Sequence, residues 1–340
     1  MDVFSPKERL LRVLNKEKVD RPPVICPGGM MNSAIVEVME KSGHTLPKAH
    51  VDEKLMTLLS NDIHTLTGFE NFGIPFCMTV EAEVLGSAIN FGTLECEPKI
   101  QKELFPSVSE VSIRPLEELL YKGRIDTVIK AGQKLSKGFP DIPVIGNLTG
   151  SISTAASIVD PMQFLKELRK DRDNAHRVLQ YVTDFLIEFA KLMIDNGITL
   201  ISIADPTATG EILGPKLFSE YAVTYLNKLI DGIHEMNVPV IVHICGDMGS
   251  VKNHIASIKS NAISTDALVN LRQLKEELGE ITTMGNLSTF LLEQGNPEKI
   301  TSQTERLLRD GIDIISPACG LSTSTSLENI RALTYTVKEH

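Results

Sequence analysis

Eight short apolar runs, separated by longer segments with helical periodicity, constrain the fold of this chain more than any other feature of its sequence. The runs cover residues 22–26, 74–80, 142–147, 198–205, 238–245, 262–267, 281–286 and 313–319. Helical patterns are clearest at 173–197, 218–237 and 297–311, and several of these segments end at Gly or Asn just before the next run. Eight strands that alternate with helices are what a (β/α)8 TIM barrel requires, so the sequence predicts an α/β fold of that kind.

Two segments depart from this alternation. An amphipathic helix is expected before the first strand, because Ser5 and Glu8 form a capping box and Pro6 suits the first helical position. Residues 81–141 are too long for one helical connection, and the stretch VLGSAINFGTLECEPKI within them resembles a hairpin. We interpret 81–141 as including an insertion over the barrel mouth, after the second strand. No linker or low-complexity segment divides the chain, so residues 1–340 are predicted to form a single barrel domain.

Charge and cysteine content narrow the class of partner and compartment. The formal net charge is -10 and Lys and Arg form no basic patch, which argues against nucleic acid as a partner. No segment offers about 18 consecutive uncharged apolar residues, and the N-terminus lacks the pattern of a signal peptide. We therefore expect a cytoplasmic protein that does not contact membranes. The five Cys residues are an odd number, which favours free thiols and metal binding over a disulfide framework.

A His and two Cys residues stand where two of the apolar runs end. His243 and Cys245 lie two positions apart in VPVIVHICGDMG, and a strand places such residues on the same side. Cys319 follows the eighth run in DIISPACG. Imidazole with thiolate is a usual zinc ligand mixture, and three protein ligands leave one position open for chemistry. The alternative is that all three are buried core residues. Because each run breaks into Gly beside these residues, we interpret the set as a catalytic zinc site.

Further polar residues follow the runs, at what would be the active face of a barrel. Asp205 ends the fourth run and is the candidate catalytic carboxylate. The amides of Asn147 and Asn286 are candidate donors to a substrate, and Glu81 and Glu83 are candidate bases near it. The asparagines and Asp205 are also ordinary turn residues that cap a following helix, and the two glutamates could be solvated charges on the rim.

The ligand set indicates the type of reaction. Two thiolates neutralise the formal charge of zinc, so a thiol at the open position could lose its proton and still attack carbon. Thiol alkylation is therefore the first hypothesis. A zinc hydrolase or lyase with Asp205 or Glu211 as general base is the second, and a non-catalytic, metal-storing protein is the third.

Several motifs together resemble the uroporphyrinogen decarboxylase superfamily over essentially the whole chain. They are ERLLRVLNKEKVDRPPV, IADPTA, HICG, the GNL of TTMGNLSTF and SPACGLSTSTSLENIRAL. Within that superfamily, the set of His243, Cys245 and Cys319 is similar to that of the zinc-dependent methylcobalamin:coenzyme M methyltransferases. The resemblance implies a (β/α)8 barrel, one zinc ion on these three residues, and transfer of a methyl group from a methylated corrinoid protein to the thiol of coenzyme M. Related proteins imply tetrahydrofolate or another acceptor as the alternative.

A uroporphyrinogen decarboxylase-like activity is the remaining alternative within the superfamily. Its substrate carries several carboxylates and would need Arg donors, yet none of the twelve Arg residues follows a predicted strand. The loop PGGMMNSAIV after the first run also lacks Arg. The chain has no D-x-H-x-x-G motif for holding a corrinoid, so methylcobalamin would have to be supplied by a partner corrinoid protein. Met30 and Met31, in the loop after the first run, either line the entry of the corrinoid or simply fill a gap. A non-catalytic protein that docks a corrinoid is a further form of the third hypothesis.

Overall fold

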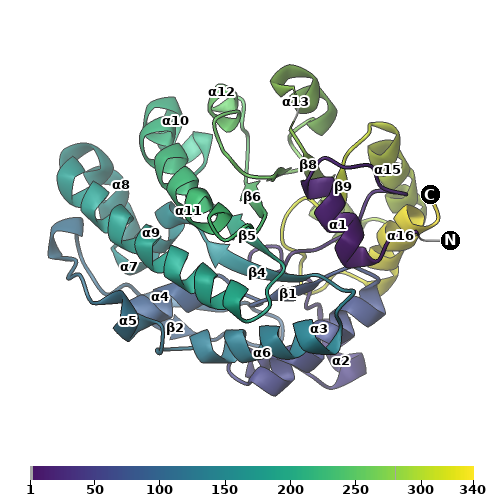
Figure 1. The fold of residues 1–340 in the computed structure, drawn as a ribbon, viewed down its shortest axis with the longest axis horizontal. Coiled ribbons are helices and arrows are strands. Elements are labelled where there is room, and N and C mark those ends of the chain that lie inside the picture. Colours follow the sequence, from purple (N-terminus) through teal and green to yellow (C-terminus); the bar gives the residue numbers. More distant parts are fainter. Residues whose placement is uncertain (1–2, 280) are drawn as a thin grey trace.

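A computed structural model describes residues 3–279 and 281–340, and its centre is a curled sheet of seven parallel strands surrounded by helices (Figure 1). The strands of this sheet are adjacent in the order β1, β4, β5, β6, β7, β8, β9. Their bounds are β1 Phe72–Ile74, β4 Val144–Thr149, β5 Leu200–Ala204, β6 Val240–Ile244, β7 Ala262–Thr265, β8 Thr283–Leu287 and β9 Ile314–Pro317. Each strand is followed by helical structure before the next, which confirms the predicted α/β barrel.

The described helices surround this sheet. The α-helices are α1 Pro6–Leu14, α2 Val36–Ser42, α3 Glu53–Thr67, α4 Val80–Leu85, α5 Leu116–Leu119, α6 Ile125–Gly138, α7 Ser151–Ile158, α8 Pro161–Lys170, α9 Arg172–Asp195, α10 Gly210–Leu217, α11 Thr224–His234, α12 Lys252–Ile255, α13 Leu271–Leu278, α14 Thr289–Gln294, α15 Pro297–Arg309 and α16 Leu327–Lys338. Two 3-10 turns, η1 Lys48–His50 and η2 Val108–Glu110, and a π-helical turn, η3 Phe218–Val223, complete the set. Helix α1 begins as predicted, since the Ser5 hydroxyl accepts a hydrogen bond from the Glu8 amide at 3.2 Å.

The first predicted strand, 22–26, closes the barrel but is reduced to a single bridge. Val24 pairs with Ile315 of β9, and the Ile25 amide donates to the Ile315 carbonyl at 3.0 Å. On the other side the Glu70 amide, just before β1, donates to the Val24 carbonyl at 2.9 Å. The run 22–26 therefore stands in the eighth strand position between β9 and β1. Its hydrogen bonds are too few for a regular strand, which corrects the predicted element.

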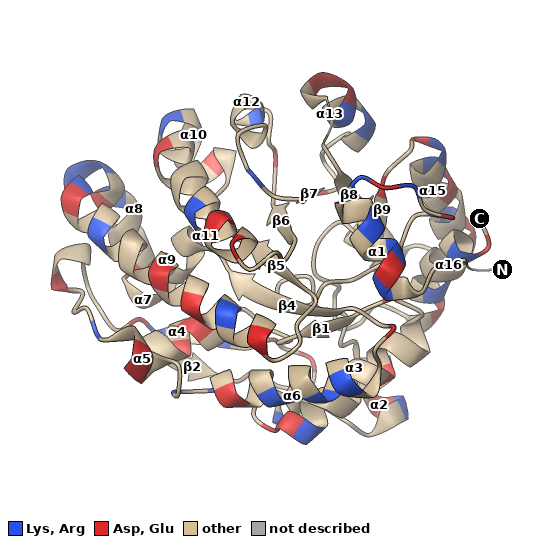
Figure 2. Cartoon of the chain, in the orientation of Figure 1, with Lys and Arg blue, Asp and Glu red and all other residues tan. Residues whose placement is uncertain are grey.

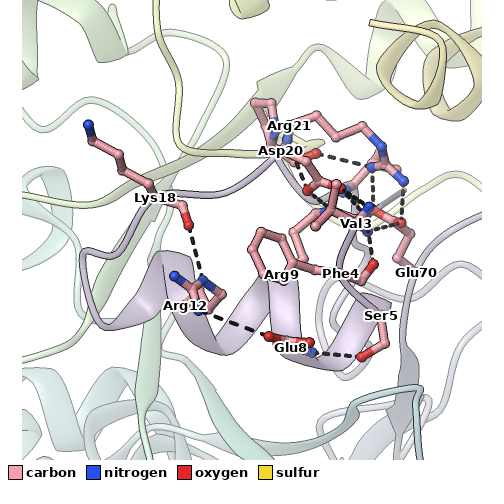
Figure 3. A network of polar contacts seen from close by, with 12 residues as sticks. Val3, Phe4, Ser5, Glu8, Arg9, Arg12, Lys18, Asp20, Arg21 and Glu70 are labelled. Carbon is pink, nitrogen blue, oxygen red and sulfur yellow. Dashed lines mark hydrogen bonds and ion pairs between the residues drawn. The ribbon is translucent and has the colours of Figure 1, made fainter. Parts of the chain in front are cut away.

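A buried network of charges supports this closure at the amino-terminal ends of the strands (Figure 3). The Glu70 carboxylate accepts hydrogen bonds from the Val24 amide at 2.9 Å, from Arg21 at 2.8 and 3.0 Å, and from Arg9 of α1 at 2.9 Å. Arg9 also donates to Asp20 at 2.7 Å. Glu70 is 3% exposed and Arg9 is fully buried, so little water competes for the hydrogen bonds between these two side chains. Side chains thus replace part of the missing backbone ladder.

The second predicted strand was placed too late in the sequence. The structure forms β1 at Phe72–Ile74, and the rest of the predicted run, 75–80, leads into α4. A short apolar run does not distinguish a buried strand from the buried start of a helix, and both lie in the core here. Glu81 is accordingly a helical residue rather than one at a strand end.

The predicted hairpin after α4 is confirmed. Strands β2 Ala88–Asn90 and β3 Lys99–Lys102 pair in antiparallel fashion, apart from the barrel sheet. Helix α6, later in the same region, packs against β1 and β4 as an ordinary barrel helix does. The part of 81–141 that is extra to the alternation therefore lies before α6.

Charged residues are concentrated on the helices, while the seven strands of the barrel sheet contain no Lys, Arg, Asp or Glu (Figure 2). This division leaves the barrel interior to apolar and small polar side chains. Within the described ranges, no helix has the length and apolar character needed to cross a membrane.

Candidate metal centre

Strands β6 and β9 carry the three predicted metal ligands to the barrel mouth, the end formed by the carboxyl ends of the strands. His243 is the fourth residue of β6, and Cys245 follows the last residue of that strand. Cys319 lies two residues beyond the end of β9. Strands β7 and β8 stand between β6 and β9, so the three side chains meet across the mouth rather than along one strand. Among the described residues these three form a group in which all ligand atoms lie within 4.8 Å of one another.

The geometry of His243 leaves one ring nitrogen for a metal. Its Nδ1 atom contacts the Ser264 hydroxyl of β7 at 2.9 Å, and its Nε2 atom lies 3.2 Å from the Cys245 sulfur. His243 and Ser264 are both fully buried, which fixes the orientation of the ring. Ligand atoms of one tetrahedral zinc lie about 3.5 to 4 Å apart, so this donor set fits zinc with small side-chain adjustments. A contact of the second ring nitrogen with a neighbouring group is usual for metal-binding histidines.

The sulfurs of Cys245 and Cys319 influence each other's titration. A hydrogen bond from Cys245, assisted by one from His243, lowers the pKa of Cys319 to about 4. The same hydrogen bond and burial raise the pKa of Cys245. The arrangement therefore already favours one thiolate at neutral pH, and thiolate is the form that binds metal.

A cavity of about 420 Å³ leads to Cys319 from the outside. Met30, Glu97 of the hairpin region and Phe290 of α14 line it together with Cys319 and its neighbour Gly320. Glu97 was not among the predicted site residues. It lies in the connection between β2 and β3 and does not follow a strand of the barrel sheet, so only the three-dimensional fold brings it to this cavity.

Asp205 is buried beside the first turn of α7. Its carboxylate accepts hydrogen bonds from the Ile152 amide at 3.1 Å, from the Ser153 amide at 2.8 Å and from the Ser153 hydroxyl at 2.6 Å. Burial raises the pKa of Asp205 to about 6, although these hydrogen bonds oppose the increase. The second ring nitrogen of His243 contacts Ser264 and not Asp205. The carboxylate thus has a structural role at α7, and its catalytic role stays a prediction.

The two predicted substrate-binding asparagines both donate to backbone carbonyls. Asn147 of β4 donates to Pro27 at 2.8 Å and to Ile74 at 3.1 Å, so it supports the loop after the first run. Asn286 of β8 donates to Asp266 and to Val269, each at 2.8 Å. Asn286 also lines an open groove of about 740 Å³ between α13 and α15, separate from the Cys319 cavity. These amides position loops of the mouth, and direct contact with a substrate stays a prediction for both.

The predicted bases Glu81 and Glu83 point to different partners. Glu81 of α4 accepts hydrogen bonds from the Thr149 amide at 2.7 Å and the Thr149 hydroxyl at 3.2 Å. Glu83 forms an ion pair with Arg124 at 2.5 Å. Neither carboxylate is among the residues that line the Cys319 cavity. The structure therefore does not bring Glu81 or Glu83 together with the metal ligands.

Arg124 follows no strand in the sequence, as expected, but the fold brings its side chain to the segment after β1. It donates to the Cys77 sulfur at 3.3 Å and to the Thr79 hydroxyl at 2.8 Å, and both of these residues follow β1. Its position before α6, distant in sequence from β1, hid this contact. Since it is almost fully buried and paired with Glu83, a single Arg here does not make the Arg-rich site that a polycarboxylate substrate needs.

The family model described as uroporphyrinogen decarboxylase (URO-D) matches residues 5–340. The chain belongs to the uroporphyrinogen decarboxylase family. Within this family it is 33% identical over 349 residues to the methylcobamide:CoM methyltransferase MtbA of Methanosarcina mazei, a match that covers 100% of this chain and 99% of the relative. It is 31% identical over 337 residues to methylcobamide:CoM methyltransferase MtaA of Methanosarcina barkeri, covering 98% of this chain and 97% of the relative.

A solved structure of a methyltransferase from Methanosarcina mazei superimposes with a TM-score of 0.93 at 30% sequence identity, covering 99% of both chains. The fold of the whole chain is therefore the one found in that methyltransferase.

Proposed function

We propose that this protein is a zinc-dependent methyltransferase that moves a methyl group from a methylated corrinoid protein to the thiol of coenzyme M. The observation that carries the proposal is the meeting of His243, Cys245 and Cys319 at the mouth, with a cavity beside Cys319. The full-length relatives that are named methylcobamide:CoM methyltransferases support the choice of donor and acceptor.

The reaction breaks the bond between methyl carbon and cobalt and forms a bond between carbon and sulfur. The electron pair of the broken bond stays on cobalt, which is reduced from Co(III) to Co(I), and the acceptor thiol loses its proton. Zinc, when bound, supplies the Lewis acidity that favours the deprotonated form of a thiol.

The residues of this chain prepare the site for that chemistry. Ser264 holds the His243 ring so that Nε2 points to the sulfurs. Burial of His243 excludes water from the inner side of the site, while the partly exposed Cys245 and Cys319 leave the outer side accessible. The cavity of about 420 Å³ offers room for a small thiol beside Cys319. A corrinoid is far larger than such a thiol, which supports a donor that docks outside on its own protein.

Coenzyme M rather than a folate is the preferred acceptor because the relatives that match over the whole chain are named for coenzyme M. A zinc hydrolase is disfavoured because Asp205, its strongest candidate base, already accepts three hydrogen bonds from the start of α7.

The test combines metal analysis with a spectroscopic assay. The purified full-length protein should contain one zinc per chain and, when mixed with methylcobalamin and coenzyme M, should cause loss of the methyl-Co(III) absorption. Cys245→Ala and Cys319→Ala should each lose zinc and methyl transfer while staying folded. Cys96→Ala is the matched control, since Cys96 is exposed and outside the group. Full zinc content in both ligand variants, or no methyl transfer by the wild-type protein, would overturn the proposal.

A further inference from the structure

A rigid turn presents Met30 at the metal centre. The Gly28 amide donates to the Met31 carbonyl at 3.1 Å, and the Met31 amide donates to the Gly28 carbonyl at 2.8 Å. Gly28 and Gly29 have φ values of +100° and +58°, which glycine adopts without a steric penalty. Asn147 donates to the carbonyl of Pro27, so β4 fixes the start of the turn.

The far side of the turn is fixed as well. The Gly29 amide donates to the Pro75 carbonyl at 2.8 Å. A Cβ atom on Gly320 would lie 2.3 Å from the Met30 carbonyl oxygen, so the turn packs directly on the residue after Cys319. Met30 is therefore held on both sides by backbone contacts rather than on a loose loop.

The two consecutive methionines differ in their contacts and in their exposure. Met31 is 1% exposed, and its sulfur lies 3.8 Å from the hydroxyl of Ser264, the residue that contacts the His243 ring. The sulfur of Met30, which is partly exposed, lies 3.6 Å from the Cys245 sulfur. Filling a gap accounts for Met31, because it is enclosed by the core. It does not account for Met30, because this side chain faces the cavity that leads to Cys319.

Met30 contacts Cys245 and lines the same cavity as Cys319, so it lies beside both partly exposed members of the ligand group. His243 is fully buried, and only the two cysteines are partly exposed. We propose that Met30 is a specificity-determining residue whose bulk limits the size of the molecule that reaches Cys245 and Cys319. The limit on molecular size rests on the position of the Met30 side chain beside the two cysteines. The identification of the molecules as thiols rests on the proposed function. An unbranched thioether suits this position, since it fills space beside sulfur and adapts to a bound ligand.

The experiment measures how the size of a reagent affects its access to the two cysteines. The full chain carrying Cys96→Ser is purified and then treated, without further preparation, with either iodoacetamide or N-pyrenylmaleimide. Alkylation of Cys245 and Cys319 is followed by peptide mass spectrometry. The measured quantity is the ratio of the rate with the bulky reagent to the rate with the small one. A ratio cancels changes in thiol reactivity and leaves the steric effect.

Met30→Ala should raise this ratio about tenfold, while Met30→Leu, which keeps the volume, should leave it unchanged. Met30→Phe should lower it, which keeps the proposal testable if the alanine variant folds poorly. Met162→Ala is the matched control, because Met162 is 63% exposed on α8, outside the cavity lining. An unchanged ratio in Met30→Ala and Met30→Phe, or a Met30→Leu variant that behaves like Met30→Ala, would overturn the proposal.

A second measurement links the restriction to the acceptor. With methylcobalamin as donor, Met30→Ala should raise kcat/KM for 3-mercaptopropanesulfonate relative to coenzyme M, because the former is one methylene longer. No reaction of the wild-type protein with either thiol would overturn the proposed function and leave the alkylation result standing. Reaction with an unchanged preference in Met30→Ala would overturn Met30 as the determinant of acceptor size.

Discussion

The buried carboxylate of Glu81 makes the stability of this protein depend on pH in a predictable way. Glu81 is 1% exposed, and burial raises its pKa from 4.5 to about 7, against the opposing hydrogen bonds from Thr149. A raised pKa means that the folded state binds the proton more tightly than the unfolded state does. The contribution to stability is therefore full at pH values below 4.5 and is lost as the pH rises through about 7.

The magnitude follows from the same shift. A tenfold change in an equilibrium constant corresponds to about 1.4 kcal/mol, so the change from 4.5 to about 7 corresponds to about 3 kcal/mol. Between pH 5 and pH 8.5 the free energy of unfolding should lose about 2.5 kcal/mol through this residue alone. Glu81→Gln removes the titration but keeps an oxygen that accepts from the Thr149 amide and an amide group that donates to the Thr149 hydroxyl.

Urea unfolding followed by circular dichroism measures this effect, because the chain contains no Trp for fluorescence. The difference in unfolding free energy between Glu81→Gln and wild type should shift in favour of the variant as the pH rises from 5 to 8.5. Asp205 titrates in both proteins, so its contribution cancels. Glu118→Gln, an exposed substitution on α5, is the matched control. A flat difference for Glu81→Gln would refute the reasoning.

Three further predictions concern the mouth. Ser264→Ala removes the partner of His243 Nδ1 and should weaken zinc affinity about tenfold, as measured by a competition titration with a chelator. An unchanged zinc affinity would exclude Ser264 as the residue that orients His243. Asp205→Asn should keep zinc but lower the unfolding free energy by about 1 to 2 kcal/mol, because one backbone amide of α7 loses its acceptor. If the variant instead loses methyl transfer at unchanged stability, Asp205 has the catalytic role. Binding of coenzyme M should release close to one proton per site near neutral pH, measured by titration calorimetry in buffers of different ionisation enthalpy, and no release would mean that the thiol stays protonated.

The barrel was predictable because its signals are local. Apolar runs and helical periodicity are properties of short windows, and they repeat along the chain often enough to specify the class of fold. The meeting of His243, Cys245 and Cys319 was predictable for a related reason. All three stand at strand ends, and a barrel brings its strand ends to one face whatever the details of packing.

The roles of individual polar side chains were not predictable, because they depend on partners that are distant in sequence. Asn147 lies within β4 and Asp205 directly follows β5, yet each is engaged by a segment more than 50 residues away. Arg124 and Glu97 carried no signal at all, since neither follows a strand of the barrel sheet in the sequence. Periodicity tells which face a residue occupies, but the hydrogen-bond partner is fixed only when the loops are in place.

Residues 22–26, which close the barrel, connect its amino-terminal end to its mouth through one short stretch of chain. The stretch begins at the Arg21 and Glu70 ion pair and ends at the turn that carries Met30. Since Val24 is held on one side by a single bridge and on the other by Glu70, native-state hydrogen exchange should reach this stretch before it reaches the regular strands. The turn that places Met30 beside the cysteines is thus continuous with a stretch of chain that Arg21 and Glu70 hold at the opposite end of the barrel.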